Sequence, residues 1–252
     1  MRLIPLIPAA LLLLSPGPAF AQGQDQDPIS YVSKADYFSI DFPNEPAVRE
    51  ITYPDEYRIN LPGRVYTSNV GKSRYTVTVV DYRDAPKIHA ARNVTCVHDA
   101  GADRPGLTAQ QRKDLTGDAC QDESVKDVRG AMMFATWNIV QKAAKVTHLA
   151  YYNSDLVEGY EVHTNNLDET RTYAVVHMHE NRLYIIEANV PKSAPAANWF
   201  QISIRFLDPQ WNPVRYSYSG LMIYSNGYPK PPLAGQGGQG GQGAQGQAQP
   251  GR

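Results

Sequence analysis

Four closely spaced strand candidates in the C-terminal half of the chain constrain its fold more than any other feature. Each is a run of β-branched, aromatic and aliphatic residues, and short polar turns separate the runs. Connections this short join antiparallel neighbours, because parallel strands need a much longer crossover. The sequence therefore predicts an antiparallel meander of residues 146–152, 157–164, 170–178 and 182–190.

The last two runs carry two histidines beside an acidic turn, in the stretch YAVVHMHENRLYIIEA at residues 173–188. A two-residue turn at Glu180-Asn181 fixes which side chains lie opposite each other. It places four apolar residues on one face of the hairpin, namely Val176, Met178, Leu183 and Ile185. His177 and His179 then lie on the other face, which we expect to be exposed to solvent.

These histidines leave one enzymatic alternative open. Two histidines two residues apart on a strand can share a metal ion, given a third ligand such as His163. The expected cross-strand neighbour of His179 is the cationic Arg182, which would repel such an ion. We therefore expect neither metal nor cofactor, and keep a hydrolytic or metal-dependent site near His177 and His179 as the alternative.

Catalytic motifs are otherwise absent from the sequence. It contains no nucleophile elbow, no zinc-protease helix motif, no phosphate loop and no dinucleotide fingerprint. Acidic pairs such as Asp155 and Glu158 occur in turn-like positions, where solvated carboxylates are expected. The sequence thus predicts no catalytic residues.

Further strands are predicted upstream. Residues 38–42 and 48–53 have strand patterns, and residues 64–70 and 73–82 form a hairpin around Gly71-Lys72. The second arm of this hairpin has two unlike faces, Tyr75, Val77 and Val79 on one and Thr76, Thr78 and Val80 on the other. One side of this strand is therefore half polar.

An amphipathic helix is predicted between the hairpin and the meander, at residues 124–143. Its apolar residues recur three and four apart, at Val125, Val128, Met132, Ala135 and Ile139. Together with the strands, this helix predicts a single α+β domain in which helices pack on an antiparallel sheet.

Cys96 and Cys120 are the only cysteines in the sequence. An isolated pair in an exported chain favours a disulfide over a metal site, a nucleophile or a free redox pair, and there is no C-x-x-C spacing. The enclosed segment is polar apart from a short helix candidate at residues 108–115, where Thr108 and Gln111 can form a capping box. Closing a loop of this length stabilises the fold by about 3.5 kcal/mol in the chain-entropy model.

Both ends of the chain are predicted to lie outside the domain. Residues 1–21 resemble a secretory signal peptide cleaved after Ala21, with an apolar run too short to span a bilayer. Residues 229–252 are rich in proline and then in glycine and glutamine, which predicts a disordered tail. The domain is therefore expected at residues 29–228 of a periplasmic or secreted protein without an integral membrane span.

Charge argues against two classes of partner. The formal net charge of the chain is −1, whereas nucleic acids and anionic lipids attract clustered basic residues. We therefore expect no nucleic acid partner.

Several segments resemble exported alphaproteobacterial proteins of unknown function, whose layout is similar to the PsbP-like fold. They are FSIDFPNEP at residues 38–46, YTVTVVDY at 75–82, NRLYIIEANVP at 181–191, WFQISIRFLD at 199–208 and VRY at 214–216. The resemblance implies an α/β/α sandwich that is entered by a short strand and closed by a helix near residues 196–206. It implies no shared catalytic set.

These observations favour a non-catalytic periplasmic binding or accessory protein. Its partner would be a protein or a small molecule of the cell envelope. Tyrosine is the commonest aromatic residue in the chain and is enriched at protein contacts, although tyrosines are also common strand formers.

Overall fold

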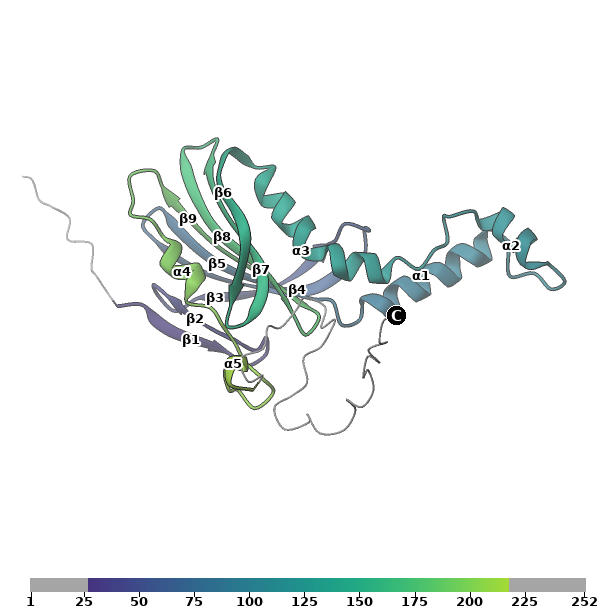
Figure 1. The fold of residues 1–252 in the computed structure, drawn as a ribbon, viewed down its shortest axis with the longest axis horizontal. Coiled ribbons are helices and arrows are strands. Elements are labelled where there is room, and N and C mark those ends of the chain that lie inside the picture. Colours follow the sequence, from purple (N-terminus) through teal and green to yellow (C-terminus); the bar gives the residue numbers. More distant parts are fainter. Residues whose placement is uncertain (1–26, 218–252) are drawn as a thin grey trace, which may run out of the picture.

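Seven antiparallel strands form the main sheet in the computed structural model, which describes residues 27–217 (Figure 1). Their order across the sheet is β3-β4-β5-β9-β8-β7-β6. The strands are β3 (Ala47–Pro54), β4 (Asn60–Val70), β5 (Ser73–Asp81), β6 (Ala143–Ser154), β7 (Val157–Asn166), β8 (Thr170–His179) and β9 (Arg182–Pro191). The predicted signal peptide, residues 1–21, and the predicted tail, residues 229–252, lie outside the described residues.

The predicted meander and its register are confirmed. Strands β6 to β9 pair in succession, and Met178 lies opposite Leu183 while Val176 lies opposite Ile185. The turn residues Glu180 and Asn181 have φ angles of 48° and 55°. Two successive positive φ values are typical of the type I′ turn, whose twist matches that of the flanking strands.

A second, three-stranded sheet lies against the first, with the order β1-β2-β10. Its strands are β1 (Ile29–Ser33), β2 (Phe38–Phe42) and β10 (Arg205–Phe206). Together with the short helix α4 (Asn198–Ile202), this sheet covers one face of the seven-stranded sheet (Figure 1). The long helix α3 (Ser124–Val140) covers part of the other face.

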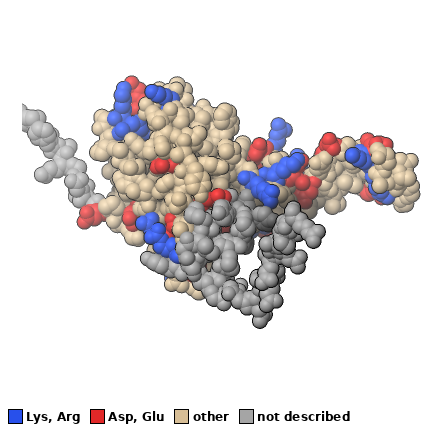
Figure 2. All heavy atoms as spheres, in the orientation of Figure 1, with Lys and Arg blue, Asp and Glu red and all other residues tan. Residues whose placement is uncertain are grey.

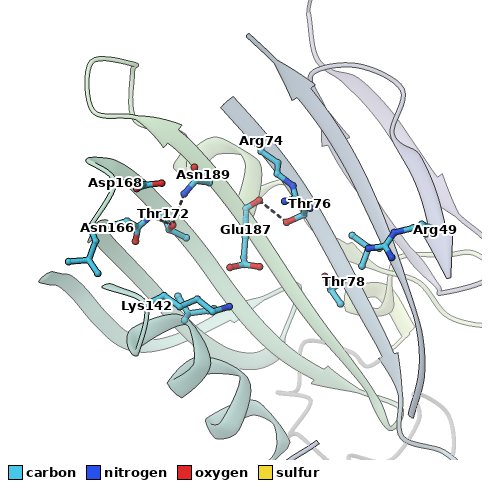
Figure 3. A pocket seen from close by; sticks show the side chains of 13 residues that line it. Arg49, Arg74, Thr76, Thr78, Lys142, Asn166, Asp168, Thr172, Glu187 and Asn189 are labelled. Carbon is cyan, nitrogen blue, oxygen red and sulfur yellow. Dashed lines mark hydrogen bonds between the residues drawn. The ribbon is translucent and has the colours of Figure 1, made fainter. Parts of the chain in front are cut away.

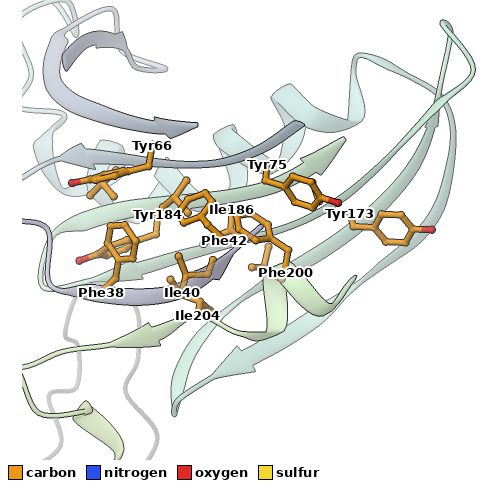
Figure 4. Close-up of a cluster of buried hydrophobic side chains, with 14 of the residues drawn as sticks. Phe38, Ile40, Phe42, Tyr66, Tyr75, Tyr173, Tyr184, Ile186, Phe200 and Ile204 are labelled. Atoms are coloured by element: carbon orange, nitrogen blue, oxygen red, sulfur yellow. The ribbon is translucent and has the colours of Figure 1, made fainter. Parts of the chain in front are cut away.

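Two apolar clusters form the core, one on each face of the main sheet. Figure 4 shows the cluster between the two sheets, where side chains from β2, β4, β5, β9 and α4 interlock. The members labelled there include Phe38, Ile40, Phe42, Tyr66, Tyr184, Ile186 and Phe200. The second cluster lies under α3 and joins Met132 and Ala135 to Val176, Met178 and Leu183. The described chain is thus a single α+β domain, as the sequence predicted.

The prediction of a solvent-exposed face for the two histidines is wrong. His177 is 0% and His179 is 4% exposed. The small sheet covers the face on which they lie, and the ring of Phe206 on β10 is 5.2 Å from that of His177 and 5.5 Å from that of His179. A strand that is buried on both faces gives a nearly continuous apolar run, so alternation alone does not identify an outer face.

Helix predictions have mixed outcomes. Helix α3 is confirmed, and α2 (Ala109–Thr116) has the predicted capping box, with the Thr108 hydroxyl accepting from the backbone N–H of Gln111. Val125, however, is 60% exposed and does not belong to the buried stripe of α3. Residues 196–206 form only the short α4 before the chain extends into β10, so the expected closing helix is mostly wrong. The small sheet accounts for this, because Phe206 is wholly buried in the cluster between the sheets.

The sequence did not predict four elements, strands β1 and β10, helix α1 (Ala85–Asp99) and the one-turn helix α5 (Val214–Ser217). Only Ala85 and His89 are buried in α1, so the helix has almost no apolar stripe to detect. Figure 1 shows that α1 runs away from the sheet and carries α2 at its far end. We call residues 85–120 the arm.

The predicted Cys96–Cys120 disulfide joins α1 to the segment after α2, with Cα atoms 5.5 Å apart. In the view of Figure 2, basic and acidic side chains are interspersed along the arm. No helix within residues 27–217 is both long enough and apolar enough to cross a membrane.

Candidate functional site: a polar groove beside helix α3

The α3-facing side of the main sheet changes from apolar to polar along its strands. Facing residues of β5, β9 and β8 form four cross-strand rows. The rows are Val80, Leu183 and Met178; then Thr78, Ile185 and Val176; then Thr76, Glu187 and Ala174; and finally Arg74, Asn189 and Thr172. Helix α3 packs on the first two rows and ends at Val140, so the polar rows extend beyond its cover.

Beyond the end of α3 the polar rows form the floor of a groove, which we call the α3 groove (Figure 3). One hollow of the groove has a volume of about 550 Å³, and an adjoining hollow of about 860 Å³ shares Arg49, Lys142 and Glu187 with it. Lys142 follows the helix, Arg49 comes from β3 and Glu187 from the central strand β9. The groove is within the size range of small-molecule sites.

Glu187 is the most unusual residue of the groove, because it is an acid in the middle of a central strand. Desolvation raises the pKa of its carboxyl, and the nearby charges of Lys142 and Arg74 lower it in part. The side chain is partly exposed, so it is open to the groove although the surrounding strands restrict its hydration. Figure 3 shows the Glu187 carboxylate between Lys142 and the residues of the Asn189 row.

Three cations line the groove without forming close ion pairs, and two of them, Lys142 and Arg74, act on the Glu187 carboxylate. None of the ion pairs within 4.0 Å described for residues 27–217 includes Arg49, Arg74 or Lys142, and none includes Glu187. All three cations are exposed. Their charges are therefore available to a bound anion.

Amide and hydroxyl groups complete the floor on the side of β7 and β8. The Asn166 and Asn189 side-chain amides both donate to the hydroxyl of Thr172, over 2.8 and 3.2 Å, and both donate to Thr170 over 2.9 Å. The Thr164 hydroxyl donates to Asn166 over 2.9 Å. This network fixes the two amide groups before any ligand arrives, which lowers the entropy lost on binding.

A second polar cluster lies at the base of the arm. His89 on α1, Asp127 on α3 and Asp55 after β3 are all buried, and their possible ligand atoms lie within 4.8 Å of one another. His89 Nε2 is 2.8 Å from Asp127 Oδ2. Desolvation, and then a hydrogen bond with the Asp55 side chain, raises the pKa of Asp127 to about 8.

The residues singled out by the sequence as a possible metal site do not meet in space. His163 lies opposite Tyr173, whereas His177 lies opposite Gly159 farther along β7. His163 Nε2 contacts Glu161 at 3.0 Å, and His177 Nδ1 donates to the backbone carbonyl of Glu158 over 3.0 Å. Burial lowers the pKa of His177 to about 4.

The prediction of solvated carboxylates in the turns is wrong for Asp155. This residue is 4% exposed, and the Nε of Arg215 lies 2.6 Å from its Oδ1. Its Oδ2 accepts the backbone N–H of Phe206 over 3.2 Å. Asp155 therefore anchors the C-terminal segment to the β6–β7 turn and has a structural role.

The first of two signals of the groove in the sequence is the half-polar face of residues 73–82, which includes Thr76 and Thr78. Glu187, within the apolar run of β9, is a second signal that the sequence analysis did not use. Lys142 and Asn166 gave no signal of their own, because only the strand register and the end of α3 bring them to the groove.

Comparison of the chain with protein-family models and with curated proteins gives no match.

Proposed function

We propose that this protein is a non-catalytic, exported binding protein that holds a small polar ligand in the α3 groove. The observation that carries the proposal is the partly desolvated Glu187 on the groove floor, near Arg74 and Lys142 but without a close ion pair, in a groove that Arg49 also lines. Placing an acid in a central strand destabilises the fold, and such a cost is typical of a functional site.

The charges specify the class of ligand. An anionic group such as a carboxylate fits the cationic rim, since arginine and lysine donate charge-assisted hydrogen bonds to it. A hydroxyl or ammonium group on the same molecule fits Glu187, which accepts hydrogen bonds when ionised. Amino acids, 2-hydroxy acids and uronic acids combine both features.

The groove lacks the arrangement of an activated nucleophile. Within the described residues, the groove hydroxyls of Thr76 and Thr172 have hydrogen-bond partners in the backbone carbonyl of Glu187 and in asparagine amides, and none of these partners is a general base. The enzymatic alternative at His177 and His179 is not favoured, because both rings are buried under Phe206 and neither lines the groove.

Export and the finer fold are parts of the same proposal. The Cys96–Cys120 disulfide supports an oxidising compartment, the periplasm or the exterior. The layers on both faces of the antiparallel sheet support a PsbP-like layout, in which α3 covers one face and α4 with the small sheet covers the other.

Calorimetric titration of the purified chain with a panel of amino acids, 2-hydroxy acids and uronic acids tests the proposal. We expect at least one class to bind with one-to-one stoichiometry. The Arg74→Ala/Lys142→Ala double variant should weaken this binding at least tenfold. Glu187→Gln should lower the affinity for ligands that carry a hydroxyl or ammonium donor.

Lys87→Ala is the matched control, because it removes an exposed lysine from the arm, outside the groove. Its affinity should equal that of the parent. The proposal is contradicted if no compound of the panel binds, or if the double variant binds as tightly as the Lys87→Ala control.

A further inference from the structure

The cluster of Asp55, His89 and Asp127 joins three segments that are distant in sequence. Asp55 begins the turn after β3, His89 lies in the second turn of α1, and Asp127 lies in the first turn of α3. Their exposed fractions are 5%, 4% and 1%. The cluster is therefore in the interior, at the junction of the arm, the sheet and α3.

Each carboxylate of the cluster is oriented by one partner, and its second oxygen receives no donor. Asp55 Oδ1 accepts the backbone N–H of Ile59 over 2.9 Å, and Asp127 Oδ2 contacts His89 Nε2. The remaining oxygens, Asp55 Oδ2 and Asp127 Oδ1, are buried and accept no hydrogen bond from a donor group among residues 27–217, although the two carboxyl groups are close enough to share a proton. Buried polar atoms without partners are uncommon, and each needs an explanation such as an ion.

The charge of the cluster is also unbalanced. No ion pair described for residues 27–217 joins Asp55 or Asp127 to a lysine or arginine. Glu56 is close enough to add further negative charge at Asp127, and the buried hydroxyl of Tyr82 has no described partner either. Burying two carboxylates close together is strongly unfavourable unless a cation or a proton neutralises them.

We propose that Asp55, His89 and Asp127 bind one divalent transition-metal cation. One imidazole nitrogen and two carboxylate oxygens form a ligand set that zinc uses, in which a fourth position is left for water. Ligand atoms about 2.1 Å from a tetrahedral ion lie about 3.4 Å apart, and the candidate atoms here lie within 4.8 Å of one another. Small side-chain shifts suffice to close the site.

A solvent pocket reaches the cluster at His89. Its volume is about 210 Å³, and its lining includes His89, Tyr57, Glu123 and the Cys96–Cys120 disulfide. An ion can therefore enter between α1 and the segment before α3. Bound there, it ties the base of the arm to α3 and to the β3–β4 turn, which is a structural role independent of the α3 groove.

Metal analysis and titration of the purified chain test this proposal, with zinc as the probe. After saturation with zinc and extensive dialysis, we expect one zinc per chain. Chelation should lower Tm, and zinc should restore it, whereas calcium and magnesium should not, since both prefer all-oxygen sites. Cobalt should give visible absorption bands at one equivalent, a readout that needs no variant.

Asp127→Asn and His89→Gln should each abolish stoichiometric zinc retention and the zinc-dependent rise in Tm. His98→Gln is the matched control, because His98 lies on the same helix as His89 and its Nδ1 is also 2.8 Å from a carboxylate, that of Asp103, but the pair is in solvent. This control should retain one zinc. If the parent retains no more zinc than Asp127→Asn and gives no cobalt bands, the proposal is overturned in favour of a proton shared by the two carboxylates.

Discussion

Two groups of ionisable residues occupy opposite faces of the same central strands, and only one of them is open. His177 and His179 on β8 are sealed beneath the small sheet, with Phe206 against both rings. Glu187 on β9 faces the other way, into the α3 groove. Desolvation lowers the pKa of His177 and raises the pKa of Glu187, so it favours the neutral form of each residue.

The comparison teaches that the second layer of a fold decides which polar residues can serve a ligand. The strand pattern around His177 and around Glu187 is similar, because each interrupts an apolar run. One face is covered by β10, which follows β9 and α4 along the chain, whereas the other is left open because α3 ends at Val140. Access, and not residue type, separates the two regions.

Removing the Phe206 ring, which covers His177 and His179, should cause the largest loss of stability. Phe206→Ala deletes a wholly buried ring and should lower the free energy of unfolding by about 3 to 5 kcal/mol. It should also expose His177 and His179 to modification by diethyl pyrocarbonate, which denaturant titration and mass spectrometry would measure. Leu167→Ala, at an 83% exposed residue of the groove, should change stability by less than about 0.5 kcal/mol. Equal losses in the two variants would remove the distinction between a sealed and an open region.

The next largest effect should be a loss of folding stability at low pH, caused by the buried His177. The pKa of His177 is about 4 in the folded chain, against about 6.5 when unfolded, so the unfolded chain binds more protons between these values. Stability is therefore present above pH 6.5 and is lost as the pH falls toward 4, by about 3 kcal/mol from this residue. His177→Asn should remove that part of the pH dependence, whereas His98→Gln on the exposed arm should leave it unchanged. Parallel curves for His177→Asn and the parent would show that His177 is not the cause.

The smallest predicted effect is a gain in stability, on replacing Glu187, where the two predictions above are losses. Desolvation raises the pKa of Glu187, so ionisation of this residue destabilises the fold as the pH rises above its unfolded value of about 4.3. Glu187→Gln should therefore stabilise the chain at pH 7 by about 0.5 to 1 kcal/mol and have little effect near pH 4. Thermal unfolding at the two pH values would measure this. A loss of more than about 1 kcal/mol at pH 7 would mean that Glu187 is needed for folding.

Local sequence patterns predicted the strands and their pairing well, but not which elements cover each face of the main sheet. Alternation and the turn at Glu180-Asn181 gave the register that places Met178 opposite Leu183. Burial of the His177 face depends on Phe206, which lies in the other sheet, and a contact between two sheets leaves no periodic trace in either segment. The same holds for the metal candidate, since His89 lies on α1, a helix without an apolar stripe.

The α3 groove was partly predictable from the sequence. Thr76 and Thr78 showed that one face of β5 is half polar, but the pattern could not distinguish a solvated surface from a floor between cations. Lys142 is placed by the end of α3, and Arg49 by the pairing of β3 with β4. The chemistry of the site therefore follows from the packing of α3 on the sheet.

The central claim is that the open polar region around Glu187, and not the sealed region around His177, receives the ligand. Mapping of amide chemical shifts in isotope-labelled protein, during titration with the panel of amino acids, 2-hydroxy acids and uronic acids, tests it most directly. We predict that the shifts cluster at Thr76, Thr172 and Glu187 and leave His177 unchanged. Shifts centred on His177 and Phe206, or on the arm, would contradict the account, as would the absence of any shift across the panel.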